Sequence, residues 1–227
     1  MKERLADMRE KLKRLHHHCK NAWHFLWHDD SLTSWLLNIV IAFVVIYFIV
    51  YPLIGAVFGT SFPIVAVLSE SMEHGLYDGK LCEQRLAEFR ESFDNYWDVC
   101  GSWYEERGIS KEQFRDFPLS DGFNKGDVII VWRAERTNLE IGDVLIFNGN
   151  RQQPIIHRIV AITEENGNIF YQTKGDHNSN SIKSPLEETR IGEERIFGQG
   201  ILRLPYFGWV KILFVDLMSL FGVQITR

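Results

Sequence analysis

Charged side chains are absent from one long stretch of this chain, because no Asp, Glu, Lys, Arg or His lies between Ser31 and Ser69. The centre of that stretch, from Trp35 to Phe58, spans about 24 residues, and a helix of about 20 apolar residues crosses the hydrocarbon core of a bilayer. A buried core helix, or the apolar part of a cleavable signal peptide, is normally shorter. The sequence therefore predicts a transmembrane anchor over residues 31–59.

Lys and Arg are also missing from the region that follows this anchor. None occurs between Lys20 and Lys80, whereas several precede the anchor: Arg9, Lys11, Lys13, Arg14 and Lys20. The positive-inside rule then places the N-terminus in the cytoplasm and the residues beyond about 60 outside it. This predicts a cell-membrane protein that spans the bilayer once and has an extracytoplasmic main domain.

Both ends of the chain have a helical pattern. Residues 1–30 are polar, with apolar residues at helical spacing: Leu5, Met8, Leu12 and Leu15. They predict an amphipathic segment on the cytoplasmic membrane surface. Residues 206–227 are apolar but include Lys211 and Asp216, and such residues cost a few kcal/mol each at the bilayer centre. A helix lying on the membrane or on the domain is therefore favoured over a second span.

Cysteine is scarce, with only 3 in the chain. Cys82 and Cys100 follow the anchor, so the predicted orientation places both in an oxidising compartment, where disulfides form and persist. We predict that they pair, with two free buried thiols as the alternative. Cys19 precedes the anchor and is expected to stay reduced.

An excess of positive charge is missing as well, since 25 Lys and Arg stand against 30 Asp and Glu for a net charge of −5. Nucleic-acid binding usually requires a basic face, so no nucleic-acid partner is expected. The 227 residues suffice for one sizeable domain and an anchor.

The sequence pattern from Lys125 onward is typical of a β domain. Short apolar runs alternate with Gly- and Asn-rich turns, and they predict strands at 127–132, 143–147, 155–162, 168–173 and 195–204. We expect a mainly β domain over residues 60–205, interrupted by a helical insert at residues 75–125. Within the insert, Leu86, Phe89 and Phe93 predict one helix, residues 97–108 a loop, and Ser110 the start of a second helix.

A strand-like run, residues 63–68, ends in Ser69-Glu70-Ser71. A serine in such a place is held by a rigid element and can still face solvent, but its hydroxyl is a weak nucleophile that needs a base within hydrogen-bond reach. His157, within the predicted strand 155–162, is the outstanding candidate. Taken singly, each residue is more often an ordinary turn serine or a core histidine.

Five short motifs occur in order along the chain: Ser69–Glu73, Gly126–Ile129, Gly142–Phe147, Pro154–Ile159 and Thr173–Asn178. Together they resemble type I signal peptidases, specifically the archaeal and endoplasmic-reticulum kind that has histidine where the bacterial enzymes have lysine. The resemblance covers the anchor and most of the chain except residues 75–125 and the N-terminal extension. It implies a signal-peptidase-like β domain behind one N-terminal transmembrane helix.

The resemblance also implies roles for four residues. Ser71 would be the nucleophile and His157 the general base, while Asp176 would orient or support that base. Ser69 would lend its hydroxyl to an oxyanion hole beside the Ser71 backbone N–H. A preorganised donor of that kind is commonly worth roughly 3–4 kcal/mol.

Several positions depart from the family pattern. Glu70 stands where the family usually has Gly, and His74 stands where it usually has Pro, which makes His74 a competing candidate for the base. The second aspartate expected shortly after Asp176 is missing. The third catalytic acid is therefore open: Asp176 acts alone, or Glu187 or Glu188 substitutes.

The function implied is a membrane-bound serine endopeptidase that removes signal peptides from exported preproteins through an acyl-enzyme, with no metal or cofactor. Its partners would be signal peptides with small residues before the cleaved bond, membrane lipid and the protein translocation machinery. Two alternatives stay open. One is a catalytically inactive, membrane-anchored β binding module, and the other is a regulatory peptidase of the same fold.

Overall fold

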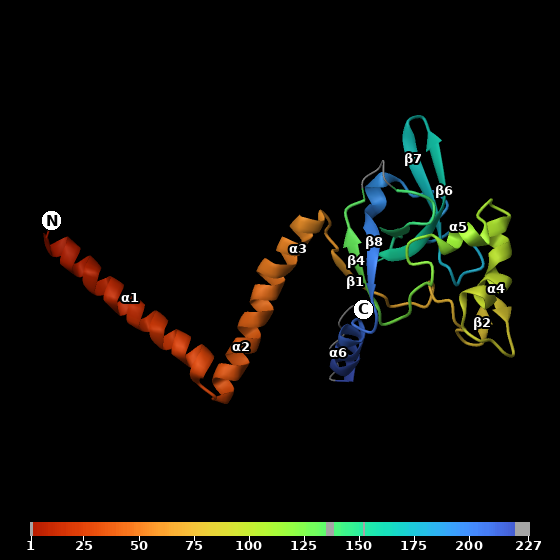
Figure 1. Ribbon diagram of the computed structural model, residues 1–227. Coiled ribbons are helices and arrows are strands. Elements are labelled where there is room, and N and C mark those ends of the chain that lie inside the picture. The colour runs from red at the N-terminus through yellow and green to blue at the C-terminus, as the bar shows by residue number, and fades with distance from the viewer. Residues whose placement is uncertain (1, 135–138, 152, 221–227) are drawn as a thin grey trace. The chain divides into compact units, whose positions relative to one another are not determined.

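The computed structural model describes residues 2–134, 139–151 and 153–220 (Figure 1). The chain divides into two compact units, Met1–Ile54 and Gly55–Arg227. The first unit is helical in its described part, while the described strands and further helices belong to the second unit. Each unit is described by itself below.

The polar N-terminal region forms α1 (Lys2–His28), and the apolar region forms α2 (Leu32–Val45), the π-helical turn η1 (Ile46–Val50) and α3 (Tyr51–Phe58). Ser31 caps α2, because its Oγ accepts a hydrogen bond from the Ser34 amide at 3.2 Å. The hydroxyl of Ser34, which is buried, donates to the Phe25 carbonyl at 2.6 Å and fastens the turn between α1 and α2.

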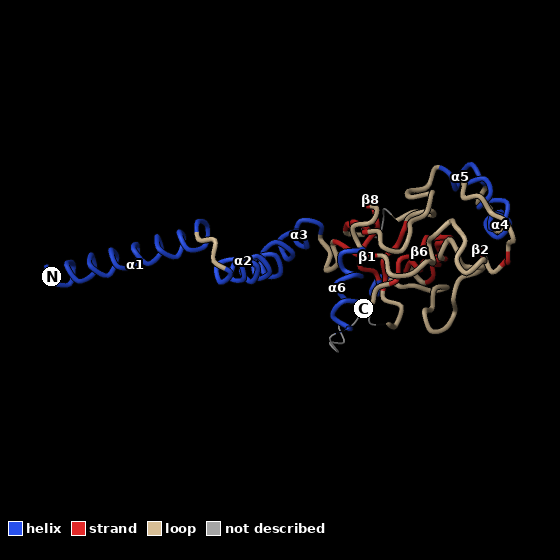
Figure 2. The backbone as a smooth tube through the Cα atoms, turned by 90° about the horizontal axis from the view of Figure 1, so that it is seen from below, coloured by secondary structure: helices blue, strands red, loops and turns tan. Residues whose placement is uncertain are grey.

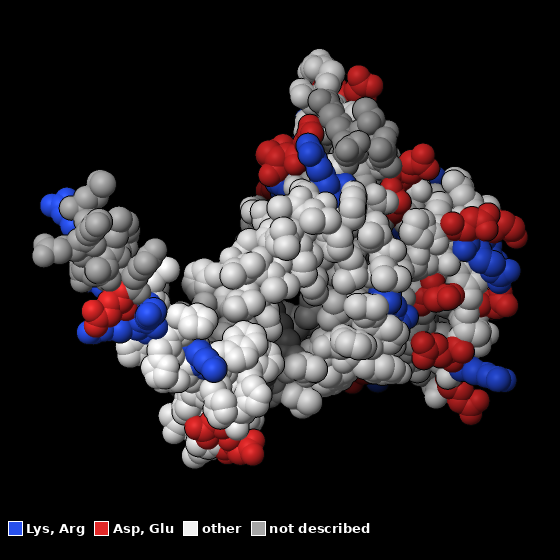
Figure 3. All heavy atoms as spheres, turned by 60° about the vertical axis from the view of Figure 1, so that its left-hand side comes forward, with Lys and Arg blue, Asp and Glu red and all other residues white. Residues whose placement is uncertain are grey.

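The stretch Leu32–Phe58 is one helical run of 27 residues with a mean hydropathy of 2.7. Among the described residues it is the one helix long and apolar enough to cross a membrane. Its apolar side chains are exposed, and the molecular face in Figure 3 carries wide areas without Lys, Arg, Asp or Glu. The helix predicted from the charge-free stretch is therefore present.

The second unit is built on a six-stranded antiparallel sheet with the order β1-β4-β8-β5-β6-β7. The strands are β1 (Ile64–Ala66), β4 (Val128–Trp132), β5 (Val144–Phe147), β6 (Ile155–Glu165), β7 (Asn168–Lys174) and β8 (Ile196–Leu204). Each predicted strand is present within a few residues of its expected ends. The mainly β fold predicted from the sequence is confirmed.

The four residues of β5 are all buried, and they alternate between two apolar cores. Val144 and Ile146 pack into one core, whereas Leu145 and Phe147 pack into another. This follows from strand geometry, since successive side chains point to opposite faces of a sheet. The same alternation in the neighbouring strand β6 determines where the residues of the site point.

The insert packs on its own apolar cluster at one end of the sheet, and α6 (Trp209–Leu220) lies at the other end (Figure 2). The elements of the insert are the short hairpin of β2 (Lys80–Leu81) and β3 (Gln84–Arg85), then α4 (Phe93–Glu105) and α5 (Lys111–Arg115). Ser110 caps α5 by accepting from the Gln113 amide at 3.2 Å, so the second predicted helix is confirmed.

The first predicted helix of the insert is wrong in position. Cys82 and Glu83 adopt positive φ values of 49° and 64° and turn the chain into a hairpin. Helix α4 then begins after the cap Ser92, and it covers most of the region expected to be a loop, residues 97–108. Apolar spacing misled the prediction, because Leu86 and Phe89 pack on the insert core from a segment that is not helical.

Cys82 and Cys100 form the predicted disulfide, with an S–S distance of 2.04 Å. The side chain of Cys19 lies outside the described part of the chain. The predicted C-terminal helix is present as α6, whose exposed apolar side chains include Val210, Leu213, Phe214 and Leu217. Residues 221–227 lie outside the described residues, and contact between α6 and a membrane stays a prediction.

Candidate active site

Ser71 lies just beyond β1 on a tightly held backbone. Pairing of this segment continues past the strand, since the Val67 amide donates to the Asp127 carbonyl at 2.8 Å. On the far side of the serine, the Phe123 amide donates to the Met72 carbonyl at 3.1 Å. The carbonyl of Ser71 itself accepts from the His177 amide at 2.9 Å. Loop segments distant in sequence therefore determine where the hydroxyl points.

The structure brings Ser71 and His157 together. His157 lies in β6, is 3% exposed, and places its Nε2 at 2.9 Å from the Ser71 Oγ. The hydroxyl of Ser69 lies 3.2 Å from the Ser71 hydroxyl. A Cβ on Gly175 would lie 2.7 Å from the Ser71 carbonyl oxygen and 2.8 Å from His157 Nε2, so this close approach requires glycine.

The second nitrogen of His157, Nδ1, is hydrogen-bonded to the carboxylate of Glu188. Glu188 is fully buried, and its other carboxylate oxygen accepts from the Ile182 amide at 2.5 Å. Its backbone is tied to β7, because the Thr173 amide donates to the Glu188 carbonyl at 2.9 Å. By contrast, the side chain of Glu187 is 62% exposed and pairs with Arg195 at 3.6 Å.

The Asp176 carboxylate, one of the three acids left open for orienting this base, is not among the hydrogen-bond partners of His157. It instead binds Arg158 through contacts of 2.7 and 3.0 Å, and it also binds His74 Nε2 at 3.1 Å. The reason is strand geometry: His157 and Arg158 are neighbours in β6, so their side chains point to opposite faces. The Asp176 carboxylate therefore cannot bind both Arg158 and His157.

His74, the competing candidate for the base, is 4% exposed and is hydrogen-bonded to Asp176. Burial by itself would raise the pKa of the Asp176 carboxyl, but Arg158 and His74 outweigh it and hold that pKa well below its usual range. Asp176 is therefore a permanently ionised partner of a permanently charged guanidinium.

The hydrogen-bonded side chains of Ser71, His157 and Glu188 have the arrangement of the catalytic groups in hydrolases that activate a serine. In such sites the imidazole accepts the serine proton, and the buried carboxylate holds the ring in the right tautomer and stabilises the imidazolium that forms. The Ser71 amide and the Ser69 hydroxyl are the donors available to a developing oxyanion.

Comparison with known proteins leads to signal peptidases. The chain is 28% identical over 102 residues to the signal peptidase complex catalytic subunit SEC11C of Homo sapiens, covering 43% of this chain and 53% of that protein. It is 35% identical over 100 residues to SEC11 of Eremothecium gossypii, covering 42% and 59%. It is 31% identical over 70 residues to signal peptidase I W of Bacillus subtilis, covering 30% and 37%.

The chain thus spans about half the length of the curated relatives it matches, and no family model matches it. The relatives nevertheless include both catalytic subunits of signal peptidase complexes and a bacterial signal peptidase I. The resemblance to type I signal peptidases that the five motifs predicted is confirmed.

Sequence reasoning missed the group that surrounds Asp176. Arg158 and Lys174 are fully buried, and Tyr96 and Tyr104 of α4 are also 0% exposed. A signal was present for the tyrosines, since Tyr96, Cys100 and Tyr104 recur every fourth residue and so share one helix face. Nothing local indicated that this face would lie against the Asp176 loop.

Proposed function

We propose that this protein is a membrane-anchored serine endopeptidase that cleaves signal peptides from exported preproteins. The observation that carries the proposal is the line of Ser71, His157 and Glu188 in a chain similar to signal peptidase catalytic subunits. The alternative of an inactive binding module gains no support from this geometry, because the hydroxyl and the imidazole lie at 2.9 Å.

The roles follow from the geometry. His157 Nε2 takes the proton of the Ser71 hydroxyl as the oxygen attacks the carbonyl carbon of the scissile bond. The Ser71 amide and the Ser69 hydroxyl stabilise the tetrahedral oxyanion, and His157 then protonates the leaving amine. Water hydrolyses the acyl-enzyme by the same route. Glu188 is the carboxylate that we assign to orient His157 and balance its charge.

The arrangement in the membrane is part of the proposal. Residues 31–59 would form the anchor, residues 1–30 would lie on the cytoplasmic side, and residues 60–205 would form the extracytoplasmic catalytic domain. Only about a dozen residues separate Phe58 from Ser71, so the nucleophile stays close to the bilayer. This suits a substrate whose apolar segment remains in the membrane. SEC11C is named as a catalytic subunit of the signal peptidase complex, so further subunits of such a complex are partners to test, alongside the translocation machinery.

The test is cleavage of a model preprotein by the purified full chain in detergent. Wild type should cut after small residues, and Ser71→Ala and His157→Ala should each reduce kcat by about 10³-fold or more. Asp176→Asn distinguishes the two candidate acids, because it should act through protein stability and not through the pH profile of kcat. An inert, folded wild type would contradict the peptidase and favour the binding module.

A further inference from the structure

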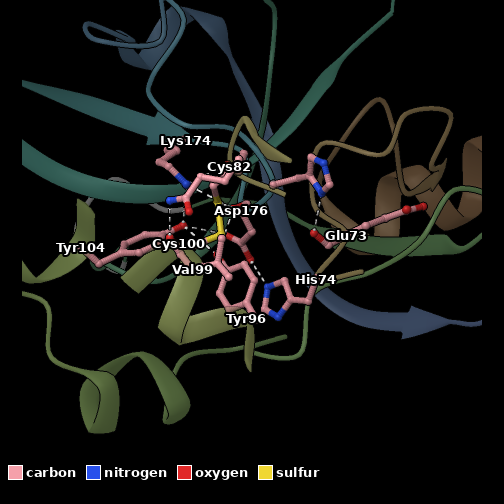
Figure 4. The surroundings of a disulfide bond; sticks show 12 residues. Glu73, His74, Cys82, Tyr96, Val99, Cys100, Tyr104, Lys174 and Asp176 are labelled. Carbon is pink, nitrogen blue, oxygen red and sulfur yellow. Dashed lines mark hydrogen bonds and ion pairs between the residues drawn. A yellow bond between two sulfur atoms is a disulfide. The ribbon is translucent and has the colours of Figure 1, made fainter. Parts of the chain in front are cut away.

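One face of α4 carries Tyr96, Cys100 and Tyr104, and all three lie against the loop of residues 174–178 (Figure 4). The Tyr96 hydroxyl donates to the Asp176 carbonyl oxygen at 3.0 Å, and the Tyr104 hydroxyl donates to the Asp176 carboxylate at 3.2 Å. Burial raises the pKa of both tyrosines well above the usual value, so both remain hydroxyl donors at any working pH. The insert thus holds Asp176 by its main chain and by its side chain.

The disulfide-bonded hairpin makes a second contact with the same loop. Cys100 lies between the two tyrosines on α4 and is bonded to Cys82 in the hairpin. The backbone N–H of Cys82 donates to the His177 carbonyl oxygen at 3.1 Å. The loop is therefore held on successive carbonyls, by Tyr96 at Asp176 and by Cys82 at His177.

This loop in turn holds Ser71. The His177 amide donates to the Ser71 carbonyl at 2.9 Å, and the Asp176 amide lies 3.4 Å from the Met72 sulfur. Gly175 packs directly against the Ser71 carbonyl and the His157 ring. Only one short loop separates α4 from the nucleophile.

The insert also contacts the other flank of the serine, at His74. The His74 ring stacks on Tyr96, with ring centroids 3.6 Å apart and an interplanar angle of 2°. Its Nε2 lies 3.1 Å from the Asp176 carboxylate, so Tyr96 and Asp176 together fix the segment that leaves Ser71. Errors of about 1 Å in the placement of a reacting group can cost about 10²-fold in rate.

We propose that the insert is a positioning element for Ser71, and that the Cys82–Cys100 disulfide locks it in the active arrangement. The inference rests on the proposed function of Ser71, and it makes the peptidase fully active only while the disulfide is intact. Tyr96 and Tyr104 act through the loop and are positioning residues.

The Cys82–Cys100 disulfide can be reduced chemically. A pocket of ≈180 Å³ is lined by both cysteines together with Trp103, Lys174 and Asn178, which gives a small dithiol access to the bond. Reduction breaks the S–S bond and forms two thiols, while the dithiol loses two electrons and two protons and becomes a cyclic disulfide.

The experiment uses the full chain in detergent and measures kcat, KM and thermal melting. Tyr104→Phe removes the hydroxyl that binds Asp176 with almost no change of volume, and Tyr77→Phe is the matched control at an exposed position of the same insert. We expect Tyr104→Phe to lower kcat by about 3- to 10-fold at unchanged KM, as the loss of a buried hydrogen bond implies. Tyr77→Phe should match wild type.

Reduction of wild type, or Cys82→Ser together with Cys100→Ser, should lower kcat by about 10- to 100-fold at unchanged KM. Reoxidation should restore the reduced wild type and leave the double serine variant low. Amide hydrogen exchange should rise locally at residues 174–178 and around Ser71, and the strands of the sheet should keep their protection.

Values of kcat within twofold of wild type in both Tyr104→Phe and the reduced protein would overturn the proposal. So would exchange that rises evenly across the sheet, since the disulfide would then only stabilise the fold. If wild type cleaves no preprotein, the proposed function has failed, and the hydrogen-exchange data then test the positioning role alone. Faster exchange confined to residues 174–178 after reduction supports the positioning role, and unchanged exchange there contradicts it.

Discussion

Two buried carboxylates, Glu188 and Asp176, lie on opposite faces of β6 and differ in the base that each one meets. Glu188 faces His157, an imidazole that can gain and lose a proton. Asp176 faces Arg158, a guanidinium that stays charged. Both are 0% exposed, so burial does not distinguish them. Glu188 contacts the imidazole that is hydrogen-bonded to Ser71, and this makes it the candidate catalytic acid, whereas Asp176 contacts Arg158 and His74 on the other face.

The largest expected effect is on catalysis, at Glu188. Glu188→Gln removes the charge that would stabilise the His157 imidazolium and allows the amide to hold the ring in the wrong tautomer. We expect kcat to fall by about 10²–10⁴-fold with little change in melting temperature. The control is Glu187→Gln, at the exposed neighbouring position, which should leave kcat unchanged. Equal losses in both variants would remove Glu188 from the mechanism.

The next effect is on stability, at Arg158. Arg158→Met leaves the Asp176 carboxylate buried without its counter-ion, which should cost about 3–5 kcal/mol of unfolding free energy in urea titrations. Adding Asp176→Asn removes the stranded charge and should recover a large part of that loss. A single variant that loses less than about 1 kcal/mol would show that His74 and Tyr104 satisfy Asp176 without the guanidinium.

The next effect, smaller when counted per pH unit, is the pH dependence contributed by Lys174, on the Asp176 side of the sheet. Burial lowers its pKa to about 7, although the charge of Asp176 acts in the opposite sense. The unfolded chain, with a lysine pKa near 10.4, then binds more protons than the native state between about pH 7 and pH 10. Native stability should therefore rise with pH across that window, by at most about 1.4 kcal/mol per unit.

The measurement compares unfolding free energies of wild type and Lys174→Met at several pH values. The difference between them should be flat below about pH 7 and should move in favour of wild type as the pH rises above it. The charged neighbours Asp176, Arg158, Glu188 and Arg107 are the same in both proteins. A difference that is constant up to pH 10 would mean that Lys174 stays charged when buried.

The smallest effect is at Thr173, whose hydroxyl lies 3.4 Å from the Glu188 carboxylate. Thr173→Val keeps the shape and loses this long hydrogen bond, so we expect kcat to fall by about 2- to 5-fold and stability to change by less than about 1 kcal/mol. Thr163→Val, at an exposed position of β6, is the control. A fall of more than tenfold would mean that this hydroxyl contributes more to orienting Glu188 than its distance suggests.

The sequence by itself determined most of the elements and the two residues that we propose to react. The absence of charge from Ser31 to Ser69 was enough for a long helix, and alternating apolar runs were enough for the strands, because both signals are local and periodic. The five motifs were enough to select Ser71 and His157. The cysteine positions predicted the disulfide from compartment chemistry.

Tertiary structure alone decided which carboxylate meets which base. Glu188 is distant in sequence from both Ser71 and His157, and it reaches His157 through backbone pairing with β7 that no local pattern encodes. The two faces of β6 then separate Glu188 from Asp176. The insert illustrates the same limit: the spacing of Tyr96, Cys100 and Tyr104 defines a helix face, but only packing showed that this face lies against the loop behind the serine.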